Sequence, residues 1–427
     1  MSLADALSIA LLRNSSILKA RSDLEAARGT AIQTRAVALP KLRGSSGYTH
    51  TEAVEEFPFT NSLTGTGTRI SPPKDEWSGD IRIVQPIYEG GAIRSALRTA
   101  RLTREQSALQ YQAVVADSLL DVRTAYHDVL LAEQQIVVQE ASVKLLSEQL
   151  ETTTRRFEAG TVPRFDVLRA EVELANARPK LIRAKNAYRV AKNNLATLLG
   201  YNIPATVRQD IPMTLTGKLE PEPYDIELPT ALVRGLERRP ELAVFRKTAA
   251  LRKERITVAK SAYKPILSLF AGYGARNSSF QKDFFSRVAG PMAGVEFNWD
   301  IYDGSLTKGK VIEAEALYEK AQVELDDGTR RVEQEVRTAY SSFLEAREVL
   351  ESQKKVQEQA EEALRLATAR YEAGTSTQLD VLNAQTALTE ARTTQVQAAR
   401  DYLVARARLE RAMGENAWPE TPKAGTK

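Results

Sequence analysis

The sequence contains no cysteine, which excludes disulfides, thiolate metal sites and cysteine nucleophiles. It contains only two histidines, His50 and His127, so one chain cannot build a histidine-rich metal centre. No apolar run approaches the roughly 20 residues of a membrane-spanning helix. The net charge is +4, from 59 basic and 55 acidic residues, and no basic run is present that would follow phosphates. We therefore expect no enzyme, no metal, no cofactor and no nucleic-acid partner.

The chain repeats itself. Residues 157–168 read FEAGTVPRFDVL, and residues 371–382 read YEAGTSTQLDVL. The same spacing, which relates residue 157 to residue 371, aligns the segment from Tyr88 to Gly200 with the second half of the chain without a gap. Far more positions are identical in this alignment than chance predicts, so we interpret the two segments as a duplication. Upstream the offset changes within residues 55–77, which are rich in Thr, Ser, Gly and Pro and predict a longer surface loop in the first half.

The duplication predicts two halves with the same order of elements. For the first half, 1–212, we expect a helix, strands at about 39–52 and 77–88, a long helix at about 91–158, a tip turn at 159–163 and a return helix at about 164–199. After a linker at 213–225, the second half, 226–414, repeats the order, with strands at about 264–276 and 292–302, a long helix at about 305–372, a tip turn at 373–377 and a return helix at about 378–413. Residues 415–427 predict a poorly ordered tail.

The two long helices have a coiled-coil pattern. Val122, Val129 and Ile136 recur every seven residues in the first, and Val336 and Phe343 do so in the second. At about 1.5 Å per residue, each helix is on the order of 100 Å long. No globular core needs that length. An ordinary filamentous coiled coil would show the same heptads and remains an alternative at this point.

The predicted strands alternate apolar and polar residues. Trp77, Ile81 and Ile83 share one face of their strand, and residues 295–302 alternate in the same way. An apolar outer face and a polar inner face are typical of a membrane β-barrel, although a soluble sandwich alternates similarly.

Four strands per chain cannot close a barrel, because single-chain barrels in membranes begin at about eight. In lipid an open sheet edge leaves backbone groups without partners, so several copies must share one barrel. Two copies would supply about eight strands and three about twelve, and the long helices favour the wider barrel because a lumen must continue into them.

On these elements the sequence resembles the TolC family of outer-membrane efflux and secretion channels. The resemblance spans nearly the whole chain and is most specific in the two EAGT turns and in the IYEGG and IYDGS junctions between strand and helix. It implies a mostly helical, mixed α and β fold: a homotrimer with a 12-stranded barrel in outer-membrane lipid and a coiled-coil tunnel in the periplasm of a Gram-negative-type bacterium. The implied function is a passive conduit served by a periplasmic adaptor and an inner-membrane transporter. A soluble coiled-coil scaffold without channel activity is the alternative.

The resemblance assigns roles to the tip turns. It implies that the adaptor docks at Gly160, Thr161, Gly374 and Thr375. The simpler interpretation is that these residues only end one helix and begin the next, because glycine readily takes the left-handed conformation there.

The resemblance also implies a gate at the periplasmic tip. Asp380 would form an acidic ring across the threefold axis, with Asn383 one turn further on, and Tyr371 would hydrogen-bond Asp166. Like charges at that range would raise each other's pKa and attract cations. Position 376 is a serine, so no gate salt bridge can form there. The alternative is that both aspartates only favour the helix dipole.

The junctions between strand and helix are Tyr88 with Gly90 and Tyr302 with Gly304, and we expect them to be flexible hinges. His127 lies on a helix face, and we expect a surface or packing residue and not a ligand.

Overall fold

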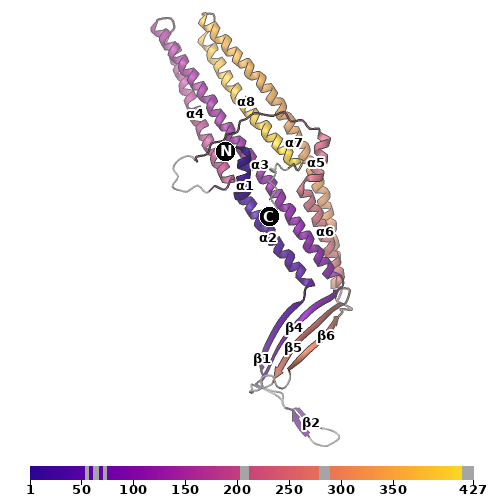
Figure 1. Ribbon diagram of the computed structural model, residues 1–427. Helices are drawn as coiled ribbons and strands as arrows, with labels where there is room; N and C mark the ends of the chain where they lie inside the picture. Colours follow the sequence, from indigo (N-terminus) through magenta and orange to yellow (C-terminus); the bar gives the residue numbers. More distant parts are fainter. Residues whose placement is uncertain (53–56, 61–66, 71–74, 202–210, 278–288, 416–427) are drawn as a thin grey trace, which may run out of the picture. The chain divides into compact units, whose positions relative to one another are not determined.

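The computed structural model describes residues 1–52, 57–60, 67–70, 75–201, 211–277 and 289–415 (Figure 1). The chain forms two compact units. The first unit comprises Met1–Leu24, Ser107–Phe245 and Leu325–Lys427, and the second comprises Glu25–Gln106 and Arg246–Glu324. Each unit therefore combines segments from both halves of the sequence, because each long helix runs through both units.

Four helices form two antiparallel hairpins in the first unit (Figure 1). The long helices α3 (Ala92–Glu158) and α7 (Leu306–Glu372) have 67 residues each. The return helices α4 (Arg164–Leu198) and α8 (Gln378–Ala412) have 35 residues each. The two halves of the sequence thus give helices of equal length.

Each half has its own hydrophobic core. In the first half, Val122 and Val129 of α3 are fully buried against Leu195 and Leu199 at the end of α4. In the second half, Phe343 of α7 is buried among residues of α8. Burying a side chain of this kind stabilises a fold by about 1.5–3 kcal/mol, so the heptad positions hold each hairpin together.

The helix that precedes the strands is broken in both halves, where the sequence predicts one helix. In the first half it consists of α1 (Leu3–Arg13), α2 (Ser15–Arg35) and the short 3-10 helix η1 (Ala36–Ala38). In the second half it consists of α5 (Leu228–Arg238) and α6 (Pro240–Ser261). Asn14 makes the first break, since its side chain accepts hydrogen bonds from the N–H groups of Ser16 and Ile17. Pro240 makes the second, since the residue before a proline avoids the helical conformation.

The predicted linker lies within residues 211–227, which have no regular secondary structure. The Tyr126 hydroxyl accepts a hydrogen bond from the N–H of Gly217, at 3.2 Å. The Tyr402 hydroxyl accepts one from the N–H of Tyr224, at 3.1 Å. One buried tyrosine from each core therefore fixes this segment.

The second unit contains an antiparallel sheet with the strand order β1-β4-β5-β6. The strands are β1 (Lys41–His50), β4 (Asp75–Glu89), β5 (Ile266–Asn277) and β6 (Ala289–Asn298). The last strand ends four residues before its predicted end, because Asn298 pairs with Ile266, the first residue of β5, and nothing remains beyond it to pair with. Within the predicted surface loop, β2 (Phe57–Thr60) pairs with β3 (Gly67–Ile70), a ribbon that the sequence did not predict.

The two faces of the sheet differ, as the alternation predicts. One face carries Ile81, Val295 and Phe297, with exposed fractions of 61%, 61% and 63%. The other face carries polar residues such as Ser45 and Asp80, which are direct partners across β1 and β4. Such an exposed apolar face indicates contact with an apolar environment.

The fold is mostly helical with a four-stranded sheet, as predicted. Among the helices that the structure describes, none has the length and apolar character needed to cross a bilayer.

Candidate functional site

The two hairpin tips are built alike. Gly160 and Gly374 have φ angles of +72° and +73°, in the left-handed region that favours glycine. The N–H groups of Thr161 and Thr375 reach back to the carbonyls of Arg156 and Arg370, each at 2.9 Å. These bonds close the C-termini of α3 and α7 in Schellman-type turns. The hydroxyls of both threonines donate to the same carbonyls, so they satisfy the helix that ends and not the helix that begins.

The return helices begin differently. Helix α8 has a complete capping box between Thr377 and Asp380, whereas α4 begins after Pro163 without a side-chain cap. One oxygen of Asp380 accepts from the hydroxyl of Ser376 at 2.7 Å, and from the N–H and the hydroxyl of Thr377 at 3.0 and 2.8 Å. The Ser376 hydroxyl, followed by these Thr377 groups, lowers the pKa of Asp380 below its ordinary value. Within one chain, this carboxylate is a helix cap.

The other predicted gate residues lie nearby. Asp166 is in the first turn of α4, and Asn383 is exposed on α8. The hydroxyl of Tyr371 is buried and has no hydrogen-bond partner among the described residues, so one chain does not make the predicted bond to Asp166. Instead the guanidinium carbon of Arg156 lies 4.8 Å from the centre of the Tyr371 ring, a cation–π contact between the two hairpins.

Polar groups line the contact between α3 and α8, which we call the α3/α8 seam. Three ion pairs cross it, Asp117–Arg411, Arg123–Glu410 and Asp128–Arg400, each at 2.7 Å. Towards the tips, Thr389 donates to Ser142 at 3.3 Å and Gln378 donates to Thr153 at 3.2 Å. The hydrophobic cores lie on either side of the seam, one in each half.

The seam is not fully satisfied. Gln378 and Gln385 are buried, and the side-chain oxygen of each lacks a hydrogen-bond partner among the described residues. A cavity of about 50 Å³ lies beside Gln385, Ser142 and Thr389. A buried acceptor without a partner costs about 1–3 kcal/mol, so each of these two oxygens lowers the stability of the seam.

His127 is buried next to the seam, as a packing residue. Burial is the main reason that its pKa falls to about 4, and the charges of Arg123 and Arg400 add to the effect. The imidazole is therefore neutral at neutral pH. No group of three or more potential ligands is arranged for a metal ion within the described ranges.

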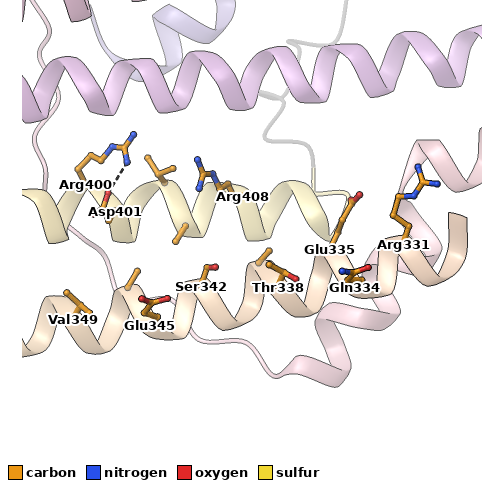
Figure 2. Close-up of a pocket in the computed structure, with 14 residues that line it drawn as sticks. Arg331, Gln334, Glu335, Thr338, Ser342, Glu345, Val349, Arg400, Asp401 and Arg408 are labelled. Carbon is orange, nitrogen blue, oxygen red and sulfur yellow. Dashed lines mark hydrogen bonds and ion pairs between the residues drawn. The ribbon is translucent and has the colours of Figure 1, made fainter. Parts of the chain in front are cut away.

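A groove of about 690 Å³ runs between α7 and α8 (Figure 2). Its lining combines small residues, including Ala339 and Ala405, with charged ones such as Glu335 and Arg408. Figure 2 shows Ser342 and Glu345 on α7 and Arg400, Asp401 and Arg408 on α8, with the guanidinium groups of Arg400 and Arg408 extending away from α7.

Two apolar stripes lie exposed on the hairpins. On α4, exposed residues recur at heptad spacing, with Phe165 and Ile182 exposed by 61% and 66%; the stripe consists of Phe165, Leu168, Val172, Ala175, Pro179 and Ile182. On α7, Val349, Val356 and Leu366 are exposed in the same way. Heptad spacing indicates that each stripe packs against another helix, and the described residues of one chain do not supply that helix.

The two junctions between strand and helix differ, because one is closely packed and the other is open. Gly90 has a φ of +61°, and an added Cβ would lie 2.3 Å from the carbonyl oxygen of Ser261. Gly304 has a φ of +65° with open space around it. Tyr88 and Tyr302 are exposed by 43% and 85%. Close backbone packing explains Gly90, and flexibility is not needed to account for it.

Comparison with known proteins gives consistent matches over most of the chain. The profile of the family described as "Outer membrane efflux protein" matches residues 6–201 and 231–415. Outer membrane protein TolC of Escherichia coli K12 is 25% identical over 418 residues, which cover 95% of this chain and 80% of TolC. Alkaline protease secretion protein AprF of Pseudomonas aeruginosa is 25% identical and covers 96% of this chain and 83% of AprF. The crystal structure of the Campylobacter jejuni CmeC outer membrane channel has the same fold, with a TM-score of 0.81 at 16% identity, over 97% of this chain and 86% of CmeC.

Proposed function

Because the chain belongs to the outer membrane efflux protein family, we propose that three copies form one passive conduit that spans the outer membrane and continues into the periplasm. Members of this family are channels and not enzymes, and they reside in the outer membrane. This membership favours a channel over a soluble coiled-coil scaffold. The proposal concerns the number of copies, the gate, and the adaptor and inner-membrane transporter that would supply the substrate.

One observation carries the proposal of several copies: α8 lies on α3, but no helix in the described part of the chain occupies the equivalent place on α7. The duplication relates α3 to α7 and α4 to α8. Hence the groove along α7, with its exposed stripe, would receive the exposed stripe of α4 from a second copy. Within one chain, Ser142 of α3 contacts Thr389 of α8. The duplication relates these residues to Val356 of α7 and Ala175 of α4, which would therefore meet between two copies.

The sheet leads to the same proposal. Strands β1 and β6 are its free edges, and one face is apolar and exposed. In lipid, unpaired edges cost several kcal/mol per backbone group, so β6 of one copy would pair with β1 of the next. Twelve strands from three copies would close the barrel. The two sequence halves would alternate around the ring as near-equivalent units, which the double family match supports.

For the adaptor, we propose the tip turns as the docking site. No atom outside the immediate backbone lies within 4 Å of a Cβ built at Gly160 or Gly374, so both turns are open to a partner. Capping accounts for the glycines, but it does not explain why two equal turns end in open space.

For the gate, we propose that the tips close around Asp380 and Tyr371. The Tyr371 hydroxyl lacks a partner among the described residues of one chain, and because it is buried, a neighbouring copy would supply one only after the tip rearranges on closing. The polar α3/α8 seam would then allow α7 and α8 to move against α3 and α4.

Conductance in planar bilayers tests this proposal. The purified protein should give small, cation-selective currents, and Asp380→Ala or Tyr371→Phe should enlarge them. The matched control is Thr377→Ala, which weakens the same helix cap by about 1 kcal/mol but keeps the carboxylate. If Thr377→Ala enlarges the currents as much as Asp380→Ala, the effect comes from capping. Unchanged currents in both gate variants would remove the gate assignment.

A further inference from the structure

The polar face of the sheet carries two arginines at one level. Arg43 on β1 and Arg82 on β4 are direct partners across the two strands. Lys41 lies two residues before Arg43 and so shares this face. Directly opposed residues have Cβ atoms about 4.5–5.5 Å apart, and like charges there destabilise the sheet. Folding alone therefore gives no reason for this pair.

A single acid lies close to these three cations. Asp80 is 3.7 Å from Arg82, and its other oxygen accepts a hydrogen bond from Ser45. Arg43 and Lys41 are exposed, and neither forms an ion pair with any residue in the described part of the chain. The other acids of these strands that share this face by register are Glu76 and Glu89 on β4 and Glu296 on β6, each about 14 Å or more from the three cations. The positive charge at this level is thus only partly neutralised.

Strand β5 presents no side chain directly beside Arg82. Gly272 is the residue of β5 opposite Arg82, so no side chain covers the guanidinium from that strand. At the level of Lys41, the ring of Phe270 lies against Gly294, where an added Cβ would approach the ring to 2.7 Å. On the β5 side the cations therefore border a glycine, and the side chains of Met292 and Phe270 lie beyond it, towards β6.

We propose that Lys41, Arg43 and Arg82, the basic cluster, bind the anionic groups of molecules that pass through the channel. The ligand class is an organic or inorganic anion that carries carboxylate, sulfonate or phosphate groups. Guanidinium groups suit it because each donates two parallel hydrogen bonds to such oxygens. The inference rests on the proposed function, in which this face lines the lumen and three copies of the cluster surround it.

Inorganic pyrophosphate is the probe. It is added to the strand side of planar bilayers that contain the purified protein, and the concentration that halves the current is measured. The unmodified protein should be blocked, less so at high salt. Arg43→Gln should raise the half-blocking concentration about tenfold, because a charge-assisted hydrogen bond of about 1.5 kcal/mol is lost. Arg43→Lys, which keeps the charge, should retain most of the block.

The matched control is Arg276→Gln. Arg276 lies on the same face, and its ion pair with Glu76, at 3.1 Å, already neutralises it. This variant removes the same charge and should shift the half-blocking concentration by less than about twofold. All variants should still run as heat-resistant oligomers.

If pyrophosphate blocks Arg43→Gln and the unmodified protein at the same half-blocking concentration, the basic cluster is not the binding site. Absence of block in the unmodified protein would also overturn it, as expected if Glu296 of a neighbouring copy neutralises the cluster. Absence of any current, in the unmodified protein and in the variants, would instead contradict the proposed function.

Discussion

At the scale of single residues, His127 links pH to stability. Burial is the largest cause of its lowered pKa, and the neighbouring charges of Arg123 and Arg400 come next. Asp128 and Asp401, which pair with Arg400, and Glu410, which pairs with Arg123, are the acids that face these cations. The ring also meets the edge of Tyr126.

The direction in which stability changes with pH follows from this lowered pKa. The folded-state value of about 4 lies below the ordinary value of 6.5, so the unfolded chain takes up the proton first. The contribution of His127 is present in full above pH 6.5 and is lost as the pH falls towards 4. It amounts to at most about 3 kcal/mol.

His127→Gln should therefore lose less thermal stability than the unmodified protein between pH 7 and pH 4.5. Circular dichroism of the helices on heating measures this difference. The matched control is His50→Gln, which changes the exposed histidine of the sheet. An equal pH response of His127→Gln and the unmodified protein would show that the charge of this imidazole does not matter.

Single residues were predicted unevenly from the sequence. The glycines of the turns and the acid in the first turn of α8 follow from local rules, so their places agree with the structure. The contact of Arg156 with Tyr371 joins residues that are far apart in sequence and have no periodic signal. Only the three-dimensional fold could bring such pairs together.

At the scale of elements, the α3/α8 seam is the contact that the sequence did not indicate. Its polar residues occupy ordinary helix positions, and heptads alone do not say which helix each face meets. The broken helices were missed for a similar reason. Asn14 ends one helix and begins another through local side-chain bonds, whereas the surrounding apolar pattern continues without interruption.

Gln385→Met tests how the seam is held. The replacement removes a buried acceptor without a partner and keeps a similar side-chain length, so the free energy of unfolding should stay equal or rise by about 1 kcal/mol. Thermal unfolding measures the change. In planar bilayers, the variant should also open less often if the halves separate along this seam. A clear loss of stability would mean that an ordered water in the small cavity satisfies Gln385.

At the scale of the whole molecule, the contact between copies can be tested covalently. The chain has no cysteine of its own, so any disulfide that forms must join the introduced cysteines. Ala175→Cys with Val356→Cys should form disulfides between copies, which give dimers and trimers on a non-reducing gel. Ser142→Cys with Thr389→Cys should close within one chain and keep the mobility of a monomer, because the two hydroxyl oxygens are 3.3 Å apart.

Monomers alone from the Ala175 and Val356 pair, under conditions that close the Ser142 and Thr389 pair, would contradict the proposed packing of α4 on α7. Either single cysteine variant should give no ladder.

The architecture was largely predictable because duplication, heptads and strand alternation are periodic. The four strands of the main sheet and the long helices agree with the structure, and the family match agrees with the resemblance. The β2–β3 ribbon was not predicted, since its short strands lie in a loop-like composition. The partners and the gate depend on contacts between chains, which a single sequence does not determine.

Helices α3 and α7 are equal in length, as are α4 and α8, and this constrains which insertions and deletions the protein can tolerate. One residue inserted into α3 beyond Asp128 would turn everything after it by about 100° about the helix axis. Thr153 would then point away from Gln378, and the tip turn would rotate with it. Only a matching insertion in α8 or a full repeat of the helical pattern would restore register, so length variants of this protein should arise in coordinated steps and not one residue at a time.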